Sequence, residues 1–450
     1  MSNSELSPQA QQLLRRLPIG IGVLIILGMV GLEFVGSTAP GFGTAQIVGT
    51  TVGAVLILIG VLGDTFGRVY RGIAVLLLNT VLVLVLVEVG AMLFLNRISI
   101  TPANEAVQYN NPYYETQDWY PAYLEDLANG SSSYFPYLIW RQNPSNGTVI
   151  NVDSNRNRVT VGADCTDDAY QVFVLGGSTV FGDGATDDLT IPSLLQSELN
   201  TNAPNQAICV TNFGVGAYVS TQDMILLLLQ LESGNIPDAV IFYNGGNDTL
   251  NGYFYQQPVV HWSYLDVVNR MQGVDEAGNN PLANTSTFRL LQRLTQSEPP
   301  AVEINIGQSA EIPTNINLGA DGDTLGAEIA QTYINMVNNV SALATVNDFD
   351  VYFFWQPLLA ADEKPLSGYE VDLVDAMPDG YITVAQEAFT LIETEAQTND
   401  ALYYLGDVFA STDTALYYDP VHVTPIGNRI IVDSIWQSIG DALVADITAN

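Results

Sequence analysis

The sequence is poor in basic side chains. Its 450 residues include 13 lysines and arginines against 48 aspartates and glutamates, and Lys364 is the one lysine. A net charge of -35 repels phosphate groups, which argues against nucleic-acid binding and against electrostatic docking to anionic lipid. An acidic surface with almost no lysine suits concentrated salt, where screening over about 3 Å at 1 M removes most of the self-repulsion. We therefore expect a halophilic source.

Cysteine and histidine are scarce as well. The chain has two cysteines, Cys165 and Cys209, and two histidines, His261 and His422. None of them belongs to a grouping with metal-ligand spacing, so we expect no metal and no cofactor. Cys165 and Cys209 lie just before or at the start of predicted strands, where the N-terminal ends of adjacent parallel strands meet. Both a disulfide and a buried, apolar Cys209 fit this placement.

Hydrophobic residues are plentiful, and the charge is unevenly placed. They make up 48% of the chain, which excludes an acidic disordered tail. Residues 101–450 hold 44 of the 48 acids, whereas residues 1–97 hold three long apolar runs, at about 18–36, 44–63 and 73–95. Each run is about as long as a helix that crosses roughly 30 Å of hydrocarbon. The sequence therefore predicts a membrane anchor of three transmembrane helices over residues 1–97.

The arginines around these runs predict an orientation. Arg15 and Arg16 precede the first run, Arg68 and Arg71 lie between the second and third, and the loop between the first two has no charge. The positive-inside rule then places the N-terminus in the cytoplasm and everything after the third run outside the cell membrane. A cleaved signal peptide is the alternative for the first run, but two more runs follow it.

The region after the anchor divides into two parts. Residues 98–164 are a juxtamembrane segment rich in Tyr, Asn, Pro and Ser, and its aromatic content predicts packing on the next domain rather than a free linker. From residue 165 to 450, short apolar runs alternate with stretches that have apolar residues at three-to-four spacing. This pattern predicts one α/β domain, a parallel sheet covered on both faces, with a loop-rich insertion at about 250–320. The predicted strands are 170–177, 207–214, 238–246 and 350–357.

Reactive groups in an open parallel sheet lie at the carboxyl ends of its strands. Three predicted strands end in unusual residues, and a fourth group stands before the last predicted helix. The four blocks are Gly176-Gly177-Ser178-Thr179, Asn212 to Tyr218, Gly245-Gly246-Asn247-Asp248, and Asp419-Pro420-Val421-His422.

These four blocks, in this order, resemble those of the SGNH (GDSL-type) hydrolases, and the resemblance runs from about Gln171 to the C-terminus. It implies a flavodoxin-like three-layer parallel sheet and a serine ester hydrolase. Ser178 would be the nucleophile, His422 its general base, and Asp419 the carboxylate that orients the imidazole. The oxyanion donors would be the N–H of Ser178, an N–H of the second block and the side-chain amide of Asn247.

One position departs from the family pattern. With the second block aligned on Asn212, the family's oxyanion glycine falls on Ala217, with Gly216 just before it. An alanine still offers its N–H where the backbone tolerates a β-carbon. If φ is positive at Ala217, Gly216 or Gly214 becomes the better donor.

The expected function is a membrane-tethered, extracellular serine esterase that acts on acyl esters, with acetyl esters of surface glycans favoured because membrane-tethered members of the family commonly act on them. The alternatives are an O-acyltransferase for exopolysaccharide with a separate donor protein, a lipase, and an inactive glycan-binding ectodomain. Expected partners are an acylated carbohydrate or lipid ester, the membrane and polysaccharide-processing proteins, with no nucleic acid.

Overall fold

The computed structural model describes residues 8–31, 44–62, 76, 79–88, 90–91, 111–166, 168–265, 267, 285, 287 and 324–449. The chain forms two compact units. One contains residues 1–100 and 280–297, and the other contains residues 101–279 and 298–450. We call the second the sheet unit.

In the first unit, α1 (Pro8–Gly31) packs along α2 (Thr44–Leu62). Glycines allow the close approach, since a Cβ on Gly22 would lie 2.5 Å from the carbonyl oxygen of Gly53. These helices overlap the first two predicted spans, and residues 79–88 and 90–91, inside the third, are helical. The other residues of the three spans lie outside the described residues. Within the described part of the chain, no helix is long and apolar enough to cross a membrane.

The sheet unit is built on five parallel strands, which confirms the predicted α/β class. Numbered along the chain, their order in the sheet is 2-1-3-4-5, as in flavodoxin-like folds. The fifth strand was not predicted, because three residues are too few to show a periodicity. In sheet order the strands are β6 (Ile208–Asn212), β5 (Tyr170–Gly176), β7 (Ala239–Asn244), β8 (Asp350–Trp355) and β9 (Leu402–Tyr404).

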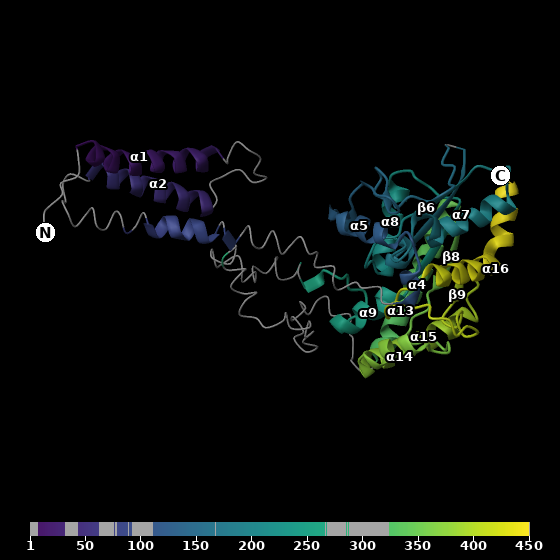
Figure 1. Cartoon of the computed structure of the whole chain (residues 1–450). Helices are drawn as coiled ribbons and strands as arrows, with labels where there is room; N and C mark the ends of the chain where they lie inside the picture. Colours follow the sequence, from purple (N-terminus) through teal and green to yellow (C-terminus); the bar gives the residue numbers. More distant parts are fainter. Residues whose placement is uncertain are drawn as a thin grey trace. The chain divides into compact units, whose positions relative to one another are not determined.

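Helices lie on both faces of this sheet (Figure 1). On one face, α7 (Ile191–Asn202) packs against α16 (Pro425–Ala449) and β6. On the other, α13 (Leu325–Asn347) contacts β8 and three further helices. These are α8 (Ser220–Glu232), α9 (Gly246–Tyr255) and α15 (Asp379–Ala396).

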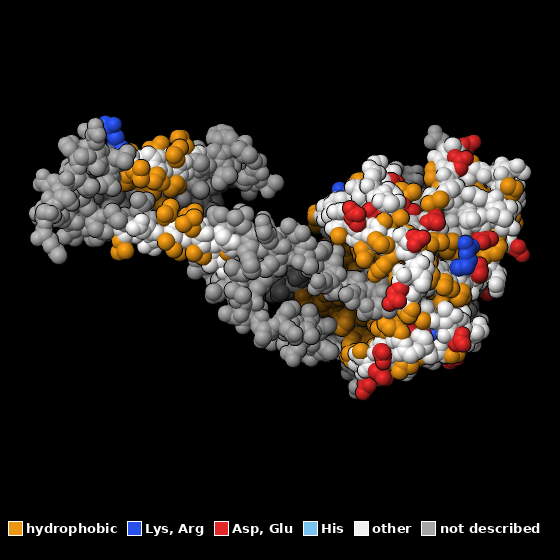
Figure 2. Space-filling view, viewed as in Figure 1, with side chains coloured by type: hydrophobic (Ala, Val, Ile, Leu, Met, Phe, Trp, Pro, Cys, Tyr) orange, Lys and Arg blue, Asp and Glu red, His pale blue; other side chains and the backbone are white. Residues whose placement is uncertain are grey.

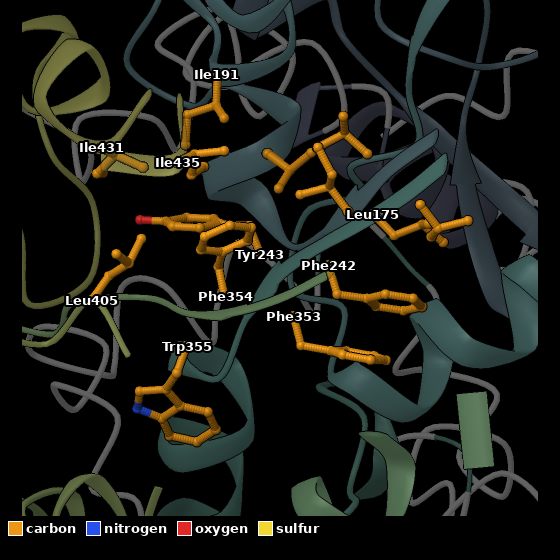
Figure 3. Packing of buried hydrophobic residues seen from close by; sticks show 14 of the residues in the cluster. Leu175, Ile191, Phe242, Tyr243, Phe353, Phe354, Trp355, Leu405, Ile431 and Ile435 are labelled. Atoms are coloured by element: carbon orange, nitrogen blue, oxygen red, sulfur yellow. The ribbon is translucent and has the colours of Figure 1, made fainter. Parts of the chain in front are cut away.

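The core follows from strands that are apolar on both faces. Phe242 and Phe353 stack with their ring centroids 5.1 Å apart. Tyr243 and Phe354, one residue further along, lie on the opposite side of the sheet with Ile431 of α16 (Figure 3). Successive side chains of each strand therefore fill two different layers, as the pleat requires. Because both faces of the strands are buried, the carboxyl ends of the strands are held in place, and the polar loops begin there.

Within the segment predicted as juxtamembrane and aromatic-rich, the structure describes residues 111–164. Its Tyr114, Tyr123 and Ile150 form a small second core with Tyr418 of the C-terminal loop, so the segment packs on the rest of the sheet unit. Its helices and strands are too short to show a periodicity in the sequence. It contains α4 (Pro112–Glu115), α5 (Tyr120–Asn129), the hairpin β1 (Ser132–Phe135) with β2 (Ile139–Gln142), and β3 (Ser145–Asn146) with β4 (Asn151–Val152).

Two other features bear on the sequence predictions. A disulfide joins Cys165 to Cys209, with the Cα atoms 4.7 Å apart, and links the approach to β5 with β6. The proposed insertion at about 250–320 begins with the second half of α9, and most of it lies outside the described residues. Acidic side chains are dispersed over the visible face of the sheet unit, with basic ones at few places (Figure 2).

Candidate active site

The turn that carries the candidate nucleophile Ser178, here called the nucleophile turn, follows β5 directly. Ser178 is the first residue of α6 (Ser178–Phe181) and lies partly exposed among buried neighbours. Gly176 and Gly177 allow other chain segments to approach it closely. A Cβ on Gly176 would lie 2.2 Å from the carbonyl oxygen of Tyr243, and one on Gly177 would lie 2.4 Å from the Nδ2 atom of Asn247. Because α6 has only four residues, its dipole adds little, and individual N–H groups must supply the donors.

Ser178, His422 and Asp419 form one chain of hydrogen bonds, although 244 positions separate the serine from the histidine. The Ser178 Oγ atom lies 2.6 Å from His422 Nε2, and His422 Nδ1 lies 2.7 Å from Asp419 Oδ2. The other Asp419 oxygen accepts the backbone N–H groups of Val421 and His422. Since the ionised carboxylate only accepts, the proton of the neutral imidazole sits on Nδ1, and Nε2 is left to accept the serine proton.

The electrostatics favour a charged imidazole. Burial alone would lower the pKa of His422, but the Asp419 carboxylate, and further the Asp183 carboxylate, raise it to about 9. Burial likewise opposes ionisation of Asp419, yet His422 and two backbone N–H groups lower its pKa. Because the Asp419 side chain is 36% exposed, water screens part of this attraction.

The second block packs beside the nucleophile turn. Gly214 packs so closely that a Cβ would lie 2.1 Å from the backbone nitrogen of Phe181, and its own N–H donates to Asn212 Oδ1. Ala217 has φ +63°, a left-handed value that favours glycine. Gly216 is therefore a better candidate donor than Ala217. Gly216 is partly exposed, has open space where a Cβ would stand, and keeps its N–H out of any backbone hydrogen bond in the described residues.

Asn247 lies in the first turn of α9, where Gly245 at φ +108° redirects the chain after β7. Its Nδ2 atom donates to the carbonyl oxygen of Tyr218 at 2.8 Å. An amide has two N–H bonds, so the second one remains for a reacting oxygen. Its neighbour Asp248 is buried and accepts the N–H and hydroxyl of Ser220, which holds the start of α8.

Several residues that bear on the site were not predicted. Arg158, fully buried, pairs with Asp187 at 2.9 Å and donates to the carbonyl oxygens of Phe181, Gly182 and Ala185, so it clamps the turn that follows the nucleophile. Nothing in the sequence marks this arginine, because its partners lie 23 to 29 positions further on.

A second unpredicted residue is Trp140 of β2, whose indole N–H donates to the carbonyl oxygen of Gly216 at 3.0 Å. Its ring also lies 6.2 Å from that of His261, so Trp140 contacts both the second histidine and Gly216. Burial lowers the pKa of His261. Among the described residues, no group of three or more His, Cys, Asp or Glu is placed to hold a metal ion.

No protein-family model matches the chain, and no curated protein matches it either. Solved structures with a similar fold include the acetyl xylan esterase AlAXEase, at 16% identity and TM-score 0.32 over 60% of this chain and 99% of that one. A catalytic mutant of Axe2, an acetylxylan esterase from Geobacillus stearothermophilus, matches at 12% identity and TM-score 0.32, over 63% and 97% of the two chains. A lipolytic G-D-S-L family protein from Veillonella parvula matches at 10% identity and TM-score 0.32, over 59% of this chain and 96% of that one. Similarity at this level carries no argument about function.

Proposed function

We propose that the chain is a serine ester hydrolase that works through an acyl-serine intermediate. The observation that carries the proposal is the chain of hydrogen bonds from Ser178 through His422 to Asp419. Ser178 Oγ attacks the ester carbonyl while His422 Nε2 takes its proton. The oxyanion is then held by the N–H groups of Ser178 and Gly216 and by the Asn247 amide, each contributing about 2.7–4 kcal/mol.

Two further steps, release of the alcohol and hydrolysis of the acyl-serine, use the same residues. The protonated His422 gives its proton to the departing alkoxide, which leaves as an alcohol, and the acyl group stays on Ser178. Water then attacks the acyl carbon as His422 takes a proton from it. His422 returns this proton to Ser178 Oγ as the acyl–oxygen bond breaks, so the carboxylic acid leaves and both Ser178 and the neutral imidazole are restored.

Hydrolysis of p-nitrophenyl acetate by the full chain in concentrated KCl tests this proposal. Ser178→Ala is expected to lower kcat/KM by about a thousandfold or more, because the nucleophile is lost. Ser197→Ala is the matched control, since Ser197 is an exposed serine of α7 outside the site. A Ser178→Ala variant as active as the parent protein would refute the assignment. Absence of activity in the parent would favour a glycan-binding ectodomain.

The substrate class rests on the family resemblance. We favour acetyl esters of surface glycans, with a polysaccharide-processing protein as partner. The same residues would serve an acyltransferase, because only the acceptor, water or a sugar hydroxyl, differs. A series of p-nitrophenyl esters separates glycan from lipid: activity that collapses beyond acetate supports deacetylation, and activity that rises with acyl length supports a lipase.

We also propose that residues 1–97 anchor the chain in the cell membrane by three helices, with the N-terminus in the cytoplasm and the sheet unit outside. The three apolar runs and their flanking arginines support this. The close α1–α2 contact at Gly22 and Gly53 is also the kind that helices in membranes make. The chain should stay with membranes after an alkaline carbonate wash and leave them in detergent, and release by carbonate alone would contradict the anchor.

A further inference from the structure

The turn after the nucleophile is held from outside the four sequence blocks. The buried Tyr123 of α5 donates its hydroxyl proton to Asp183 Oδ1 at 2.7 Å, and the hydroxyl oxygen of Tyr123 accepts the N–H of Gly184 at 2.6 Å. Tyr114 adds a bond to the carbonyl oxygen of Gly184 at 2.9 Å. The Tyr123 hydroxyl therefore fixes the direction of the Asp183 carboxylate as well as the backbone next to it.

Asp183 is tied to the nucleophile on its other side. Its backbone N–H donates to the carbonyl oxygen of Ser178 at 2.9 Å, and the hydroxyl of Ser178 lies 2.6 Å from His422. The carboxylate of Asp183 is thus fixed by Tyr123, and its backbone is fixed by Ser178. The negative charge of this carboxylate helps to raise the pKa of His422.

The other titratable groups around His422 define its surroundings. Asp419 is the second carboxylate, and the Tyr418 ring is stacked on the imidazole with centroids 5.6 Å apart. Three tyrosines on other elements lie within range of the Asp419 charge. Burial raises the pKa of each phenol, and the Asp419 charge raises it further, so these tyrosines remain neutral. These phenols are Tyr114 on α4, Tyr369 on α14 (Gly368–Asp375) and Tyr381 on α15.

We propose that Tyr123 and Asp183 form a second positioning pair for the catalytic centre. Tyr123 fixes Asp183 beside the nucleophile turn, and Asp183 joins Asp419 in stabilising the imidazolium that forms when Ser178 gives up its proton. The pair deepens the proposed hydrolase function and rests on it. It also explains why the segment before the sheet packs on the nucleophile turn.

Two variants separate charge from geometry. Asp183→Asn keeps an oxygen that accepts from Tyr123 but removes the charge, so the apparent pKa of the kcat/KM profile should fall by about 0.5–1 unit. Tyr123→Phe keeps the charge but frees the turn, so kcat should fall about tenfold with KM little changed. Tyr134→Phe is the control, because this tyrosine of β1 is 74% exposed and should leave both parameters unchanged.

The outcomes distinguish this pair from the proposed function. An Asp183→Asn profile that superposes on the parent profile, or a Tyr123→Phe variant with the parent kcat, overturns the pair while the hydrolase stands. If the parent protein has no esterase activity, the imidazole pKa is read by NMR instead. The chain has two histidines, so His261→Asn assigns the signals. An unchanged pKa of His422 in Asp183→Asn then refutes the pair without any appeal to activity.

Discussion

The ionisation of His422 links the geometry of the candidate site to pH. The imidazole donates to Asp419 through Nδ1 and accepts from Ser178 through Nε2, so it must be neutral before it can take the serine proton. Its pKa in the folded protein, about 9, lies above the ordinary value of 6.5. The protonated form therefore stabilises the fold, fully below about pH 6.5, and this contribution is lost as the pH rises through about 9.

Activity should follow the opposite course. We expect kcat/KM for p-nitrophenyl acetate to rise from pH 7 to pH 10 with an apparent pKa near 9, after subtraction of spontaneous hydrolysis. In Asp419→Asn this rise of kcat/KM should occur at lower pH, because the charge that raises the pKa of His422 most is gone. The limiting rate should also fall by about a thousandfold or more. An apparent pKa that stays near 9 in the variant would show that Asp419 does not set the pKa of His422.

Ala217 offers a test of local strain. A left-handed φ of +63° costs an alanine roughly 1 kcal/mol, and glycine adopts it freely. Ala217→Gly should therefore raise the free energy of unfolding by up to about 1 kcal/mol in a urea titration. Ala342→Gly, at an exposed helical position of α13, should lower it by about the same amount. If both substitutions destabilise alike, Ala217 is not strained.

Single residues differ in how far the sequence reveals them. Ser178, Asn247, Asp419 and His422 are marked by their short blocks and by the scarcity of histidine, and their roles remain predictions until activity is measured. Tyr123 and Arg158 carry no such mark. Each acts on a turn more than 20 positions away, and only the packing of the chain brings it there.

At the scale of elements, α14 supports the loop that presents Asp419. Its Glu370 accepts the backbone N–H groups of Leu416 and Tyr417 through one oxygen and binds Lys364 through the other at 2.6 Å. Both side chains of this ion pair are fully buried. The one lysine of the chain therefore neutralises a carboxylate that fixes the segment leading into the Asp419 loop.

Breaking this pair should lower the stability of the fold. Lys364→Met leaves Glu370 buried without its partner, so the free energy of unfolding should fall by about 3–5 kcal/mol, measured with guanidinium chloride. The exposed pair of Arg429 and Glu198 is the matched control, and Arg429→Met should cost less than about 1 kcal/mol. Equal losses in the two variants would contradict a special role for the buried pair.

Elements with a clear pattern were predicted and short ones were not. The four long apolar strands and the amphipathic helices are found where their periodicities place them, since each side chain's burial repeats along the element. β9, α14 and the hairpins of residues 132–152 were missed. They are stabilised mainly by contacts with distant residues, which local spacing does not record.

The whole molecule is dominated by its negative charge. Residues 101–450 carry 44 acids and 8 basic residues, and acids are spread over the visible face of the sheet unit rather than gathered at one site (Figure 2). Such a surface repels itself in dilute buffer and is hydrated in salt. We therefore expect the surface charge to affect stability rather than the choice of substrate.

Salt should therefore stabilise the full chain. We expect the thermal midpoint to rise when KCl increases from about 0.1 M to 1 M, where the screening length falls from about 10 Å to 3 Å, and to change less above that. KCl is preferred to sulfate, because sulfate also strengthens apolar burial. A midpoint that does not depend on KCl would contradict the halophilic interpretation.

The sequence by itself determined the class of fold, through apolar strands alternating with amphipathic helices, and singled out the serine, histidine and aspartate of the candidate triad. Only the tertiary structure brought Ser178 within 2.6 Å of His422, put a left-handed residue at position 217 and placed Tyr123 on Asp183. The reason is physical. Periodicity and short motifs record local backbone preferences, whereas a site is assembled from segments that meet only when the sheet and its helices bury their apolar faces together.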